Sequence, residues 1–97
     1  MATTKDYKDY VLDQLSILEG ITCKPMMGEY LLYYNNVLFG GIYDDRLLVK
    51  KTSNNEKYKL EESIPYTNAK PMYLIDSDDT DLIKDIILDT YKDLKVK

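Results

Sequence analysis

The segment Met26–Lys51, MMGEYLLYYNNVLFGGIYDDRLLVKK, decides the fold of this chain. It contains three runs of apolar and aromatic residues, separated by Asn35-Asn36 and Asp44-Asp45. Asn and Asp tolerate the left-handed backbone that two-residue hairpin turns require. The segment therefore predicts three consecutive antiparallel strands joined by tight turns. Two-residue loops also fix the register between the strands.

Alternation along these strands divides their side chains between two faces of the predicted sheet. The first face is mainly aliphatic and consists of Leu31, Tyr33, Leu38, Gly40, Ile42, Leu47 and Val49. The second, called the aromatic face below, consists of Tyr30, Leu32, Tyr34, Val37, Phe39, Gly41, Tyr43, Arg46, Leu48 and Lys50. We expect the helices to cover the aliphatic face.

The aromatic face would then remain exposed as a surface for a protein partner or for a second copy in a homodimer. The residues that we expect to make this contact are Tyr30, Leu32, Tyr34, Phe39, Tyr43, Leu48 and Lys50. An Asp at position 32 or 39 should then disrupt association without unfolding the domain. The alternative is that the C-terminal helix or the segment 63–71 covers this face, in which case the same substitution would unfold the protein.

The flanking segments supply the rest of a single domain, residues 1–97. Apolar spacing predicts a helix near 5–19 and a strong amphipathic helix from Asp78. Pro25 places the extended segment 21–27 at a sheet edge, because proline cannot donate to a strand ladder. We expect a polar loop at 52–55, a short helix at 56–62 and a strand at 72–75. The order α-β-β-β-β-α-β-α predicts a two-layer α+β fold, with helices on one face of a mostly antiparallel sheet of about five strands.

Composition argues against several functional classes. Thirteen basic and seventeen acidic side chains give a net charge of −4, which weighs against direct nucleic-acid binding. The basic residues Lys50, Lys51, Lys57 and Lys59 gather in one part of the sequence, where we favour a solvated strand end over a nucleic-acid surface. The chain lacks His, which excludes Cys-His and Ser-His catalysis, and the single Cys23 is expected to be structural. The first ten residues contain no apolar run, so we expect a cytoplasmic protein without a membrane segment.

One motif resembles catalytic chemistry. Residues 73–80, YLIDSDDT, place Asp76 and Asp78 after an apolar strand, as in phosphatases that use an aspartate nucleophile and magnesium. That chemistry requires a parallel sheet built after the motif, and a single helix follows here. We therefore expect Ser77 or Asp78 to cap that helix, with no metal, cofactor or catalytic residue. A small metal-dependent enzyme or ligand-binding protein using Asp76 and Asp78 is the alternative.

The central segment contains a recognisable set of short motifs, formed by Met26, Met27, Gly28, Tyr30, Gly40, Gly41, Asp45 and Lys50. In these residues the chain resembles the TfoX/Sxy family, and in particular the N-terminal domain of these competence regulators. The resemblance implies a two-layer α+β domain similar to secretion-chaperone-like folds, without established catalytic residues. It also implies a role in switching on DNA-uptake genes by assisting a transcription activator. From it we expect a small protein-interaction module, a transcription-related adaptor.

Overall fold

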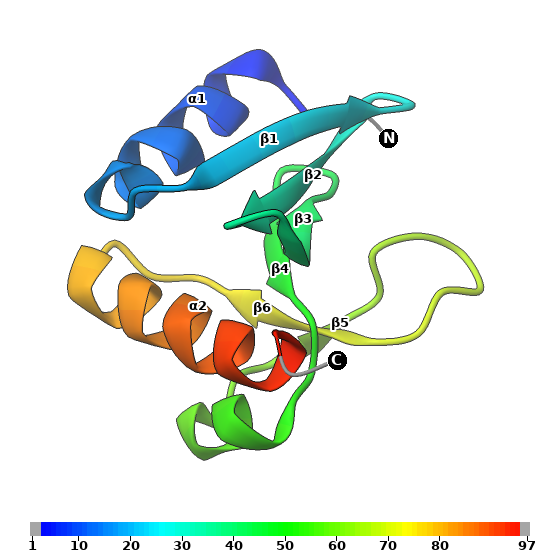
Figure 1. Cartoon of the computed structure of the whole chain (residues 1–97). Helices are drawn as coiled ribbons and strands as arrows, with labels where there is room; N and C mark the ends of the chain where they lie inside the picture. Colours follow the sequence, from blue (N-terminus) through cyan, green and yellow to red (C-terminus); the bar gives the residue numbers. More distant parts are fainter. Residues whose placement is uncertain (1–2, 96–97) are drawn as a thin grey trace.

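The computed structural model describes residues 3–95 as a two-layer α+β domain (Figure 1). The helical elements are α1 (Lys5–Gln14), the short 3-10 helices η1 (Leu15–Ile17) and η2 (Ser53–Tyr58), and α2 (Thr80–Leu94). The strands are β1 (Ile21–Met26), β2 (Glu29–Tyr34), β3 (Val37–Ile42), β4 (Leu47–Val49), β5 (Glu62–Ser63) and β6 (Met72–Ile75). Within these residues the strands form one antiparallel sheet of six, in the order β1-β2-β3-β4-β6-β5. The predicted fold class is confirmed, with one strand more than expected.

Both central hairpins have the predicted two-residue turns. Asn35, Asn36, Asp44 and Asp45 all have positive φ, between 49° and 67°. Tyr34 pairs with Val37 at one turn, and the Tyr43 and Arg46 backbones exchange two hydrogen bonds of 2.9 Å at the other. The turn residues therefore set the hairpins as the sequence indicates. The segment with Pro25 is the edge strand β1, also as predicted.

The predicted division of the sheet into two faces is wrong, because the register shifts between Leu32 and Tyr33. Tyr33 pairs with Leu38, whereas Leu32 pairs with Gly40, so the backbone of β3 contains one extra residue, Phe39. A bulge of this kind reverses the alternation on one side of the irregularity. Leu32 consequently shares a face with Ile42, Leu47 and Val49, which the sequence had assigned to the opposite face.

One hydrophobic core lies between this face and the helices. Its buried members are Val11, Leu15, Leu18, Leu32, Phe39, Ile42, Leu47, Val49, Ile75, Ile83, Ile86 and Ile87. They come from α1, η1, the sheet and α2, so both helices cover the same face, and Figure 1 shows them on one side of the strands. Leu48 is also fully buried but is not part of this cluster. Since it alternates with Leu47 and Val49, its side chain lies on the far face.

The structure corrects the local predictions for residues 52–63 and for the start of α2. The segment expected to be a polar loop at 52–55 begins η2, where the Asn55 amide oxygen accepts a hydrogen bond of 2.9 Å from the backbone of Thr52 at the start of the helix. The helix expected at 56–62 therefore ends at Tyr58. Residues 62–63 form the extra strand β5, which pairs with β6 at Tyr73 and Met72. The helix α2 begins at Thr80 instead of Asp78.

Gly40 is required by close packing between β3 and β4. A Cβ atom at this position would lie 2.1 Å from the carbonyl oxygen of Leu48 and 2.8 Å from Cα of Val49. Both atoms belong to the backbone, so the strands would have to separate. We expect Gly40→Ala to lower the free energy of unfolding by about 2 kcal/mol, as overpacked cores do. Urea denaturation would measure the loss, and an unchanged midpoint would contradict this account of the glycine.

Candidate functional site

The residues predicted to form the aromatic interaction face do not form an exposed surface. Leu32, Phe39 and Leu48 are fully buried, and Tyr43 is only 6% exposed. Leu32 and Phe39 belong to the core beneath the helices, whereas Leu48 lies on the other face. Tyr30, Tyr34 and Lys50 are half-buried. The bulge in β3 explains why Leu32 and Phe39 lie in the core, whereas Leu48 and Tyr43 are buried on the far face, so these residues do not form the exposed surface that was predicted.

The far face of the sheet instead carries a groove beneath the segment 64–71, which connects β5 to β6. This segment projects from the body of the domain and is drawn in yellow-green in Figure 1. The groove has a volume of about 620 Å³, which is typical of ligand sites. Its lining consists of Leu38, Gly40, Tyr43, Lys50, Lys51, Pro65, Tyr66, Ala69, Lys70, Pro71 and Met72. The segment therefore forms one wall of this groove.

Arg46, the single arginine of the chain, holds this segment against the sheet. Its guanidinium donates to Ser63 Oγ, to the carbonyl of Ile64 at 3.1 Å and to the carbonyl of Pro65 at 3.4 Å. Its Nε also donates to the carbonyl of Tyr43 at 3.1 Å, which fixes the base of the side chain. A planar group with several donors can satisfy these acceptors together, which a lysine ammonium could not do in the same geometry.

Two tyrosines form an aromatic corner of the groove. The rings of Tyr43, from the sheet, and Tyr66, from the projecting segment, lie 6.2 Å apart between centroids at an angle of 51°. Tyr43 is buried and burial raises the pKa of its hydroxyl, so it is neutral at physiological pH. Tyr66 is 60% exposed, and the neighbouring Ile64 is 53% exposed. These side chains offer apolar surface that a bound group could cover.

The charged side chains of the groove all have the same sign. Among residues 3–95, those that line it are Lys50, Lys51 and Lys70. The ammonium of Lys51 lies 2.9 Å from the carboxylate of Glu62, whereas Lys50 and Lys70 form no ion pair with any other described side chain. The groove is thus a local positive region on an acidic chain, with an apolar floor.

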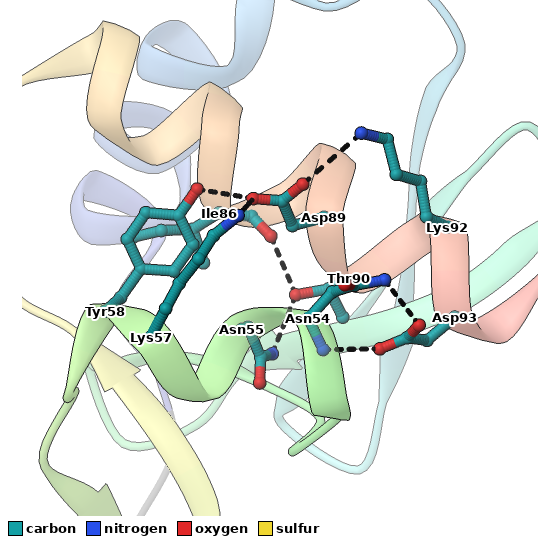
Figure 2. A network of polar contacts seen from close by, with 9 residues as sticks. All are labelled: Asn54, Asn55, Lys57, Tyr58, Ile86, Asp89, Thr90, Lys92 and Asp93. Atoms are coloured by element: carbon teal, nitrogen blue, oxygen red, sulfur yellow. Dashed lines mark hydrogen bonds and ion pairs between the residues drawn. The ribbon is translucent and has the colours of Figure 1, made fainter.

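A second group of polar contacts joins η2 to α2 (Figure 2). The carboxylate of Asp89 accepts a hydrogen bond of 2.5 Å from the Tyr58 hydroxyl. It also lies 3.0 Å from the ammonium of Lys57 and 3.5 Å from that of Lys92. The hydrogen bond with Tyr58 and the two lysines keep the pKa of Asp89 below its usual value. This arrangement fastens one helix to another and accounts for Lys57, a member of the basic cluster seen in the sequence.

Tyr58→Phe should make the free energy of unfolding less dependent on pH in the alkaline range. Burial and the hydrogen bond with Asp89 raise the pKa of Tyr58 from 10.0 to about 12. As the pH rises, the unfolded chain therefore loses this proton first, and stability is lost between about pH 10 and about pH 12. We expect the wild type to lose more free energy of unfolding across this range than Tyr58→Phe. At neutral pH the variant should be about 1 kcal/mol less stable, since it lacks the hydrogen bond.

Urea denaturation at several pH values would measure this difference. Tyr66→Phe, the same substitution in the exposed ring of the groove, is the matched control for the ionisation of tyrosine in general. Parallel pH profiles for the wild type and Tyr58→Phe would show that the contact with Asp89 does not contribute.

Two residues of the acidic run after β6 make hydrogen bonds with the helices, Asp79 with α2 and Asp78 with α1. Asp79 caps α2 by accepting hydrogen bonds from the backbone of Asp81 at 3.1 Å and of Leu82 at 3.2 Å, so the predicted cap was misplaced by one or two residues. Asp78 accepts a hydrogen bond of 2.9 Å from Tyr10 of α1. Asp76 is exposed. Residues 3–95 contain no group of three or more His, Cys, Asp or Glu side chains placed to hold a metal ion.

The motif residues near the β1–β2 turn fasten the N-terminal segment. Met27 and Gly28 form the turn with φ of 50° and 88°, and Met27 is 97% exposed. The carbonyl of Gly28 accepts a hydrogen bond of 3.1 Å from the backbone of Thr3. The carboxylate of Asp45 accepts one of 2.8 Å from the backbone of Thr4, which caps α1. These residues therefore connect the first helix to two hairpin turns.

The other residues singled out in the sequence take part in strand pairing, close packing or burial. Met26 pairs with Glu29 at the end of the hairpin. A Cβ at Gly41 would lie 2.6 Å from the carbonyl oxygen of Tyr30 and 2.7 Å from the Tyr43 ring. Cys23 is half-buried, and burial raises the pKa of its thiol.

No helix within the described range 3–95 has the length and apolar character needed to cross a membrane.

Comparison with known proteins shows the family of this chain. The family model of the TfoX N-terminal domain matches residues 13–83. The chain is also 32% identical over 78 residues to an uncharacterized 12.7 kDa protein encoded in the trpE 5′ region of Spirochaeta aurantia. That alignment covers 78% of this chain and 68% of the relative. The chain belongs to the TfoX N-terminal domain family.

Proposed function

We propose that this chain is a non-catalytic interaction module that works as a transcription-related adaptor, and that its partner protein binds in the groove beneath residues 64–71. The observation that carries the proposal is the groove itself, where Tyr66 is held in an exposed position beside a buried aromatic floor. Membership of the TfoX N-terminal domain family, whose resemblance to competence regulators implies assistance to a transcription activator, supports the transcriptional part.

The construction of the groove favours binding of another molecule over a purely structural role. A segment of eight residues that only connected β5 to β6 would not need the two contacts that the Arg46 guanidinium makes with its carbonyls, those of Ile64 and Pro65. Exposed Ile64 and Tyr66 have apolar surface that contact with a partner would remove from water. Aromatic residues that combine an apolar ring with a polar end are enriched at the centres of protein interfaces.

Site-specific crosslinking in the native cells tests this proposal. A photoreactive benzoylphenylalanine replaces Tyr66, and mass spectrometry identifies the proteins to which it crosslinks. The matched control carries the same group in place of Tyr10, which is 47% exposed on α1 and does not line the groove. We expect a transcription regulator or an RNA polymerase subunit to crosslink from position 66 and not from position 10. Crosslinks that are absent, identical at both positions, or confined to proteins outside transcription would refute the proposal.

A further inference from the structure

We infer that the groove beneath residues 64–71 binds an acidic peptide segment that carries an aromatic or aliphatic anchor side chain. This inference rests on the proposed function, because it specifies the chemistry of the partner at the same site. The anchor would pack against Tyr43, Tyr66 and Met72, and carboxylates on either side would contact the ammonium groups of the three lysines.

Charge complementarity is the first argument. The chain as a whole has a net charge of −4, yet the charges that line the groove, within the part of the chain that the structure describes, are those of Lys50, Lys51 and Lys70. Two of these lysines have no carboxylate partner among the other described residues, and the third shares its ammonium with exposed Glu62. An arriving carboxylate can therefore pair with Lys50 and Lys70 without first breaking an ion pair.

The half-buried position of Lys50 strengthens this argument. Its backbone is fixed on both sides, since its N–H donates to the carbonyl of Phe39 at 2.9 Å and its carbonyl accepts from Asn55 at 2.8 Å. The side chain therefore starts from a fixed point directly after β4 and reaches the wall of the groove. A cation placed in this way, beside apolar surface that reduces screening by water, attracts an anion more strongly than a fully exposed lysine does.

The apolar floor distinguishes a peptide from a nucleic acid. Phosphate tracks are bound by a row of Lys and Arg along a surface, and the only arginine is already engaged with residues 63–65. Seventeen carboxylates elsewhere on a chain of this size would repel a polyanion that extends beyond the groove. A short acidic segment with one large side chain matches both the restricted positive region and the apolar corner formed by Tyr43 and Tyr66.

Selection from a library of short random peptides, displayed on phage and bound to the immobilised full chain, tests the inference. We expect the selected peptides to be enriched in Asp, Glu and aromatic residues relative to the starting library. Synthetic versions of the best peptides would then be measured by fluorescence anisotropy. Replacing their Asp and Glu by Asn and Gln should weaken binding about tenfold or more, and added salt should weaken the acidic forms only.

Variants of the protein locate the binding. The groove variant combines Lys50→Gln, Lys51→Gln and Lys70→Gln. The matched control combines Lys5→Gln, Lys24→Gln and Lys59→Gln, which change the net charge equally and lie outside the groove lining. We expect about tenfold weaker binding of the acidic peptides by the groove variant, with little change in the control. Arg46→Lys, which leaves the three lysines in place, should weaken binding by releasing the wall that holds Tyr66. Circular dichroism would confirm that each variant is folded.

The outcomes separate the two proposals. Selected peptides without an acidic bias, an absence of selected peptides, or equal losses in both triple variants would overturn the inference. Preferred binding of a single-stranded oligothymidylate, used as a competitor, would overturn it in favour of a nucleic acid. If acidic peptides are selected but crosslinking from position 66 finds no transcription protein, the adaptor role fails and the inference stands. If a transcription protein crosslinks through a segment without acidic residues, the inference alone fails.

Discussion

Leu32→Asp should leave most of the protein unfolded at room temperature. Leu32 is fully buried on β2 and packs in the core between the sheet and both helices. Removing its side chain would cost about 2–5 kcal/mol. An unpaired carboxylate in the same place would add several kcal/mol more. Domains of this kind have about 5–15 kcal/mol of stability in total, so the substitution uses most or all of it. Circular dichroism and size-exclusion chromatography would measure the loss of the folded state.

Leu31→Asp is the matched control for this prediction. Leu31 is the preceding residue on the same strand, is half-buried and pairs with Gly41. Because neighbouring side chains on a strand lie on opposite faces, its carboxylate would remain in contact with water. We expect this variant to be folded, although less stable than the wild type. A folded Leu32→Asp with the stability of the wild type would contradict the core described above.

Asn55→Ala should have the second largest effect, about 3 kcal/mol of unfolding free energy, because buried polar groups would lose their partners. Asn55 is fully buried at the centre of the contacts shown in Figure 2. Its amide nitrogen donates to the carbonyl of Lys50 and to Thr90 Oγ1, both at 2.8 Å. Its amide oxygen accepts from the backbone of Thr52 at 2.9 Å. Thermal and urea denaturation would both report the loss.

Asn54→Ala distinguishes this role from a general effect of asparagine in η2. Asn54 is exposed, and its amide nitrogen donates to the carboxylate of Asp93 at 2.6 Å. Water can replace this contact, so we expect a cost below about 1 kcal/mol. Equal effects for the two substitutions would show that the buried contacts of Asn55 do not join η2 to α2 in the manner described.

The hairpins could be predicted from sequence because their turns are local. Asn35-Asn36 and Asp44-Asp45 supply the left-handed backbone of two-residue turns at little cost, whichever other segments the chain contacts. The amphipathic pattern of α2 is equally local, and Ile83, Ile86 and Ile87 from it lie in the core, whereas Leu82, which was placed on the same stripe, is 37% exposed. The Gly40-Gly41 pair beside Phe39 is compatible with a bulge or with close packing, but the two faces were assigned without a bulge, and a single extra residue exchanges them. This one feature explains why buried Leu32 and Phe39 were assigned to an interaction surface.

The groove could not be predicted from spacing in the sequence, since its walls come from distant segments. Tyr43 and Lys50 directly follow the central strands β3 and β4, whereas Pro65 and Tyr66 come about twenty residues later. Two signals were nevertheless present. A lone arginine in a chain otherwise rich in lysine indicates a contact that needs several donors in one plane. Two prolines at 65 and 71 indicate a segment with restricted backbone freedom. Strand β5 was missed for a related reason, because two residues acquire strand geometry only by pairing with β6.

The two ends of the sheet have a consequence for solubility. An outer strand presents unpaired backbone groups that can recruit strands from other molecules, which is a common route to aggregation. On one side, β1 contains Pro25, which has no N–H to donate, and the exposed charge of Lys24. On the other side, β5 is only two residues long, and Glu62 on it is exposed and charged. Neither β1 nor β5 offers a long, flat and apolar edge, so both edges of the sheet disfavour the addition of strands from further copies.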